Sequence, residues 1–170
     1  MTSKAQSRLK VVLYILVLLL AELVQTSVFG TLKLGVIPCV MPVAVACISV
    51  CEGAENGCVF GLLGGCLWAW SDQTGYYGVW CILALTAAGV LAGLITERVL
   101  LKGLKTALVL SGGALLLTEG LYAVTSAFSG RIPPSALITT FLPGALIALI
   151  LCLGFFPLTD RISRIGGLHG

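Results

Sequence analysis

The position of the basic residues relative to the long apolar stretches constrains this chain most strongly. Six apolar segments cover most of its 170 residues: 11–29, 34–50, 57–70, 78–95, 106–128 and 136–156. If all six cross a membrane with the N-terminus inside, the cytoplasmic side receives Lys4, Arg8, Lys10, Arg98, Lys102, Lys105, Arg161 and Arg164. The outer side receives Lys33 and Arg131. Because Lys and Arg are enriched in short cytoplasmic loops, this pattern predicts a polytopic inner-membrane protein with both termini cytoplasmic.

The composition supports a single integral membrane domain over residues 1–170. Hydrophobic residues make up 58% of the chain and charged residues 10%, and the mean hydropathy is +1.09. Six membrane segments leave short tails and loops, which gives no room for a soluble catalytic or nucleotide-binding domain. We therefore expect an all-α membrane protein, a compact bundle of six transmembrane helices.

Two of the segments are short for a membrane crossing. Segments 34–50 and 57–70 could be re-entrant, since a run of about 10–14 apolar residues often does not span a bilayer. If segment 57–70 alone failed to cross, Arg98, Lys102 and Lys105 would move to the outer side, which favours six crossings. The first segment continues for about the 20 residues that a crossing needs and lacks a small-residue cleavage site, so we expect an uncleaved anchor.

Aromatic residues mark the outer surface. Five of them surround the connection 71–75, namely Trp68, Trp70, Tyr76, Tyr77 and Trp80. Trp and Tyr favour the membrane interface. The net charge of +3 is explained by membrane orientation, and no nucleic-acid partner is expected because no basic patch is interleaved with exposed aromatic residues.

The seven cysteines do not have the spacing of a metal site. The sequence has no Cys-x-x-Cys pair, and its one histidine is His169 near the C-terminus. Zinc sites need close cysteine pairs with further ligands, so we expect small buried thiols, no metal and no cofactor. A nucleophile would also lack a histidine base. The sequence therefore predicts a protein that is not an enzyme.

Glycines recur at helical spacing in two segments. Gly57, Gly61 and Gly65 are four residues apart, and Gly89 and Gly93 repeat this spacing. Glycines on one helix face let another backbone approach closely. The contact could lie within the chain or form a groove for a partner helix.

Polar residues within apolar segments are the remaining candidates for function. Glu22 with Gln25 lies in the first segment and Glu119 in the fifth, whereas Asp72 follows the glycine-rich segment. Intramembrane carboxyls face the bundle and suggest function. Protonated or hydrogen-bonded groups with a structural or partner-contact role are favoured over a proton relay, because no intramembrane basic residue accompanies them. A loop aspartate such as Asp72 is usually a helix cap or a solvated residue.

These residues give the chain a resemblance to the MreD family of bacterial rod-shape-determining membrane proteins. The resemblance runs from the first helix to the last through a set of short motifs: Gln25-Thr26, Glu52-Gly53, Gly57, Gly61, Gly65, Asp72, Gly75, Gly78, Gly89 and Gly93. The chain departs from the family pattern where Cys39 follows Pro38 and Val43 follows Pro42, since the family has a polar residue after proline there.

The resemblance implies a fold like the substrate-binding subunits of energy-coupling-factor vitamin transporters. It also implies a scaffold in the bacterial cell membrane that binds MreC and helps to maintain rod shape. The actin-like MreB, the glycosyltransferase RodA and a penicillin-binding transpeptidase would belong to the wider complex, and the bundle could form a homodimer. The alternative is a vitamin-binding S-component of an energy-coupling-factor transporter.

Overall fold

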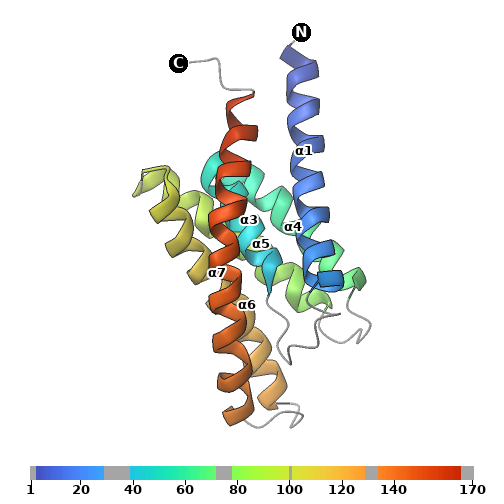
Figure 1. Cartoon of the computed structure of the whole chain (residues 1–170), viewed down its shortest axis with the longest axis vertical. Coiled ribbons are helices and arrows are strands. Elements are labelled where there is room, and N and C mark those ends of the chain that lie inside the picture. Colours follow the sequence, from blue (N-terminus) through green and yellow to red (C-terminus); the bar gives the residue numbers. More distant parts are fainter. Residues whose placement is uncertain (1–2, 29–38, 72–77, 100, 129–133, 166–170) are drawn as a thin grey trace.

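The computed structural model describes residues 3–28, 39–71, 78–99, 101–128 and 134–165 (Figure 1). These ranges form six α-helices and a short π-helical segment: α1 (Ser3–Leu23), η1 (Val24–Val28), α3 (Val40–Glu52), α4 (Ala54–Ser71), α5 (Gly78–Arg98), α6 (Leu104–Phe128) and α7 (Pro134–Arg164). The described part contains no strand. The predicted all-α fold is therefore confirmed.

Four helices are long and apolar enough to cross a membrane: Gln6–Ser27, Gly78–Arg98, Leu104–Leu121 and Leu142–Arg164. They give the chain the character of a membrane protein. The two other α-helices are α4, with 18 residues, and the apolar α3, with 13 residues. At about 1.5 Å per residue α3 is about 20 Å long, which is less than the roughly 30 Å of a bilayer core.

Helix α3 forms the centre of the bundle. Every residue from Val40 to Cys51 is buried, and α3 contacts each of the other five α-helices. A helix that is apolar all round is typical of a protein core or of a membrane span, and here it lies in the core. The polar residue Ser49 of this buried helix has a hydrogen-bond partner within the same helix, because its hydroxyl donates to the Val45 carbonyl at 2.8 Å. The other five α-helices thus surround α3.

The helices extend beyond the predicted apolar segments at two places. The connection expected at residues 51–56 is reduced to Gly53, because α3 ends at Glu52 and α4 begins at Ala54. Gly53 has a φ of 90°, which glycine adopts readily. The tail expected from Pro157 is helical as far as Arg164, so Pro157 lies inside α7. Residues 34–38, which belong to the second predicted segment, lie outside the described residues.

Successive helices run in alternating directions, so the start of α1 and the end of α7 lie at the same end of the bundle (Figure 1). We call this the basic end, because it carries the described basic side chains Arg8, Lys10, Arg98, Lys102, Lys105, Arg161 and Arg164. At the opposite end, α6 and α7 extend beyond the other helices (Figure 1).

Candidate functional site

The glycines of the two helical stripes meet each other in the contact between α4 and α5. A β-carbon added to Gly57 would lie 2.5 Å from the Gly89 carbonyl oxygen, and one added to Gly61 would lie 2.6 Å from the Leu85 carbonyl oxygen. A β-carbon on Gly65 would lie 2.6 Å from the Ile82 α-carbon. These distances are far below van der Waals contact, so the two backbones approach closely all along the stripe.

The stripe continues to the turn between α3 and α4. A β-carbon on Gly93 would collide with the backbone of Gly53 and Ala54. The described face of the stripe is therefore occupied by a helix of the same chain. Of the two interpretations left open by the sequence, packing within the chain is the one this geometry provides, and a partner helix would have to bind elsewhere.

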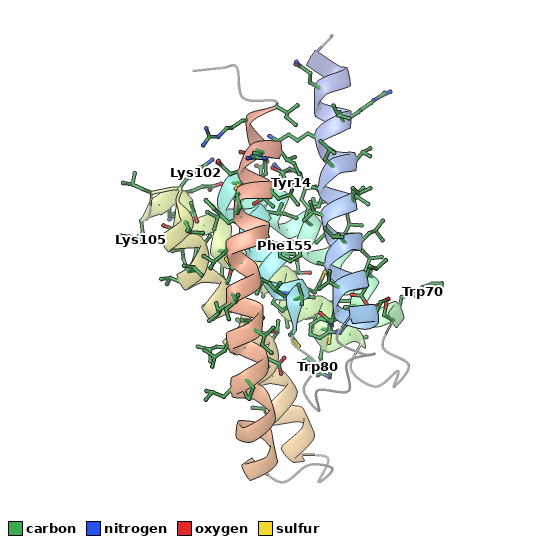
Figure 2. All side chains as sticks on the ribbon, viewed as in Figure 1. Tyr14, Trp70, Trp80, Lys102, Lys105 and Phe155 are labelled. Carbon is green, nitrogen blue, oxygen red and sulfur yellow. The ribbon has the colours of Figure 1, made fainter. Side chains whose placement is uncertain are left out.

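A buried polar cluster lies at the basic end and joins three helices. The Tyr14 hydroxyl of α1 donates to Glu52 Oε1 at 2.6 Å and lies 3.4 Å from the Thr159 carbonyl oxygen of α7. Lys10 Nζ lies 2.8 Å from Glu52 Oε2. The Tyr14 ring also packs edge-on against Phe60, with the ring centroids 5.3 Å apart. Both oxygens of Glu52 thus have partners in α1, and Tyr14 ties α1 to the end of α3 (Figure 2).

Two further long-range bonds close the turn between α3 and α4. Lys102 Nζ donates to the Cys51 carbonyl oxygen at 2.8 Å, which satisfies a backbone acceptor at the end of α3. The Ala54 backbone N–H donates to Glu97 Oε1 at 2.9 Å, which supplies a partner at the start of α4. Charged residues from the connection before α6 and from the end of α5 therefore hold this turn in place.

Gln25 performs a similar task at the opposite end of α3. Its side-chain oxygen accepts from the Val40 backbone N–H at 3.0 Å and from the Met41 N–H at 3.3 Å. The side chain of the N-cap residue Cys39 makes no capping hydrogen bond. The first N–H groups of a helix need an acceptor, and here it comes from a side chain 15 residues earlier in the chain.

Glu22, one turn before Gln25, has no such role. The residue is 9% exposed, and among the described residues neither carboxyl oxygen has a hydrogen-bond partner, although the Ser71 side chain is nearby. Glu119 on α6 interacts with the Cys39 thiol at the start of α3. The predicted residues Gln25 and Glu119 thus both lie near the beginning of α3, whereas Asp72 lies outside the described residues.

Tryptophans mark the end of the bundle opposite the basic end. Trp70 at the end of α4 is 91% exposed, and Trp80 near the start of α5 is exposed as well. Lys102 and Lys105 lie toward the other end of the molecule (Figure 2). Tyr76, Tyr77, Lys33 and Arg131 lie outside the described residues.

Sequence reasoning missed several residues of these contacts. Tyr14 and Thr159 come from helices far apart in the chain, and so do Cys47 of α3 and Cys152 of α7, whose sulfur atoms lie 3.6 Å apart. No local spacing announces them, because each depends on how the helices pack. A tyrosine within the first membrane segment was the one available signal, since a buried hydroxyl needs a partner.

Comparison of the chain with protein-family models, with curated proteins and with solved structures found no significant match in any of the three.

Proposed function

We propose that this protein is a non-enzymatic membrane scaffold of the MreD type, which binds the bitopic protein MreC and links it to the cell-wall elongation machinery. The observation that carries this proposal is an exposed apolar seam along α1. Its residues are Leu9, Val12, Leu16, Leu19 and Leu23, all exposed in the described structure.

The seam has the spacing that two packed helices use. Alternating steps of three and four residues bring side chains into line along one face of an α-helix. Val12 is 58% exposed and Leu16 is 61% exposed, whereas Tyr14, Val17 and Leu18 of the same helix face the core. A bitopic partner offers one transmembrane helix, which fits a single straight seam.

The close contact between the glycines of α4 and α5 also favours a partner site on α1. Since α4 and α5 use their close-packing faces on each other, and α3 is enclosed, the surfaces left for a partner helix lie on the outer helices. Helix α1 is at the edge of the bundle (Figure 1). Other outer helices also expose apolar side chains, such as Leu83 of α5 and Leu146 of α7, so the choice of α1 rests on the spacing of its seam.

The test is co-purification with an MreC-type partner in mild detergent. Val12→Ala with Leu16→Ala should reduce partner capture, because packing between membrane helices depends on close side-chain contact. The matched control is Leu83→Ala with Leu91→Ala on α5, where both leucines are exposed too. Equal loss in both double variants, or no loss in either, would contradict binding through the α1 seam. In rod-shaped cells depleted of the unaltered protein, the α1 variant should fail to restore the rod shape.

A vitamin-binding S-component remains the second candidate, and one observation favours it. The buried carboxyl of Glu22 has no hydrogen-bond partner in the part of the chain that the structure describes, which would suit a site that a polar ligand completes. Calorimetric titration of the purified protein with water-soluble vitamins decides between the two. Specific binding that is lost in Glu22→Leu would favour the S-component and contradict the scaffold.

A further inference from the structure

Two basic side chains at the connection between α5 and α6 take no part in holding the bundle together. Arg98 ends α5 and Lys105 lies in the first turn of α6, and both are exposed. Neither has an ion-pair or hydrogen-bond partner among the described residues. Lys102, between them, is occupied, since its Nζ donates to the Cys51 carbonyl oxygen. Arg98 and Lys105 are therefore left to bind a group outside the bundle.

Exposed apolar side chains lie between these two cations. Val99 is 76% exposed and Leu101 is 89% exposed. Apolar side chains gain free energy when they leave water, and this connection joins two helices that can cross a membrane. Segments that combine basic and apolar side chains lie at the boundary between the lipid headgroups and the hydrocarbon. Val99 and Leu101 thus reach the hydrocarbon at the depth where Arg98 and Lys105 meet the headgroups.

An exposed apolar track continues from Lys105 along α6. Val109 is 68% exposed and Leu116 is 66% exposed, and they share a face with Lys105 because residues three or four apart are neighbours on a helix. Between them, a β-carbon added to Gly113 would meet nothing within 4 Å. The track lies within Leu104–Leu121, one of the possible membrane crossings. An occupant of this surface must therefore combine an anionic head with an apolar tail.

We propose that the connection between α5 and α6 binds an anionic phospholipid of the surrounding membrane. Arg98 and Lys105 bind the headgroup phosphate, and one acyl chain lies along the exposed face of α6. A guanidinium can bind two phosphate oxygens at once, whereas an ammonium acts as a point charge. Basic sites beside membrane helices bind such headgroups in other proteins.

This lipid site is separate from the apolar seam of α1. The connection between α5 and α6 lies on the flank of the bundle away from α1 (Figure 1), and Lys105 lies on that flank (Figure 2). The inference also holds for either orientation of the basic end in the membrane. It does not depend on the proposed scaffold function.

Native mass spectrometry of the purified full chain in detergent tests the proposal. The protein is titrated with phosphatidylglycerol and, separately, with phosphatidylcholine of the same acyl chains, and the apparent Kd of the first bound lipid is measured. We expect tighter binding of phosphatidylglycerol, because only this headgroup has a net negative charge. Equal Kd values for the two lipids would overturn the proposal.

Two double variants remove the same charge from different parts of the basic end. Arg98→Gln with Lys105→Gln should weaken phosphatidylglycerol binding about 25-fold, because each basic residue near a membrane surface contributes about a factor of five. The control is Arg8→Gln with Arg161→Gln, on α1 and α7. Both arginines are exposed, and neither has an ion-pair or hydrogen-bond partner in the described part of the chain.

The control variant should weaken binding much less, and gel filtration in detergent checks that both variants are folded. Unchanged binding after loss of Arg98 and Lys105 would overturn the proposal. Equal losses in the two variants would overturn it as well, because the lipid would then be attracted by the basic end as a whole.

Two further measurements separate a lipid site from a site for free phosphate. Val99→Ser with Leu101→Ser keeps every charge and should weaken phosphatidylglycerol binding, because the apolar contact with the hydrocarbon is lost. Inorganic phosphate at the concentration of the lipid should not displace it. Full affinity in the serine variant, or displacement by inorganic phosphate, would contradict a site that recognises the lipid.

Discussion

At the scale of single residues, the stability of the basic end depends on the partly buried carboxylate of Glu52, which has two partners. Glu52 receives a hydrogen bond from Tyr14 and an ion pair from Lys10. A buried group that loses its partner keeps the cost of leaving water. Removal of the Tyr14 hydroxyl should therefore cost more stability than the net contribution of one hydrogen bond.

Tyr14→Phe should lower the free energy of unfolding by about 1–3 kcal/mol, because Glu52 Oε1 loses its donor while the ring contact with Phe60 is kept. Thermal unfolding in detergent measures this. Arg164→Met is the control, since the exposed pair of Arg164 with Asp160 is worth under about 1 kcal/mol. Equal melting temperatures for Tyr14→Phe and the unaltered protein would refute the role of the hydroxyl.

Glu22 and Gln25 provide a second pair of contrasting residues on one helix. Gln25→Met should destabilise the bundle by about 1–3 kcal/mol, because the N–H groups of Val40 and Met41 lose their acceptor. Glu22→Gln should change stability little, because neither oxygen of Glu22 has a hydrogen-bond partner among the described residues. The two variants are compared by thermal unfolding in the same detergent. A larger loss in Glu22→Gln than in Gln25→Met would contradict this assignment.

At the scale of elements, the close contact between α4 and α5 separates two kinds of glycine. Gly57, Gly61 and Gly65 have backbone atoms of α5 where a β-carbon would be placed, whereas a β-carbon on Gly113 or Gly120 of α6 would meet nothing within 4 Å. Substitution by alanine should therefore have opposite effects in the two helices.

Gly61→Ala should destabilise the protein, because the added methyl group would lie 2.6 Å from the Leu85 carbonyl oxygen and must push the backbones apart. Gly113→Ala should be neutral or stabilising by up to roughly 1 kcal/mol, since alanine favours a helix over glycine. Thermal unfolding and gel filtration of the two variants measure the difference. If Gly61→Ala were as stable as Gly113→Ala, the contact between α4 and α5 would be looser than described.

The difference between these elements also shows what the sequence could and could not predict. Apolar length predicted helices, and glycines four residues apart predicted a close-packed face. The resemblance implied a turn at Glu52-Gly53, but its neighbours did not predict the contacts that hold it, which come from Glu97 and Lys102 later in the chain. The same reason applies to Gln25, whose role depends on the position of α3 in space.

At the scale of the whole molecule, the basic end and the tryptophan end give the bundle a direction. The contacts of Lys10 with Glu52 and of Lys102 with Cys51 bring the start of α1, the end of α3 and the connection before α6 together. Tyr14 adds the end of α7. These ends must therefore lie near the same membrane surface, whichever surface that is.

We propose that this surface is cytoplasmic, because basic residues near helix ends are retained on that side. Reporter fusions after Gly103 and after Gly170 should give a cytoplasmic signal, and a fusion at Arg131, between α6 and α7, should give an external one. The measurement compares an enzyme active only outside the membrane with a fluorescent protein active only inside. Opposite signals at Gly103 and Gly170 would contradict an even number of crossings between them, whereas external signals at both would reverse the orientation and keep the bundle. The two results are distinguishable. The first would change the number of crossings made between Gly103 and Gly170, whereas the second would change only the side of the membrane that the basic end faces.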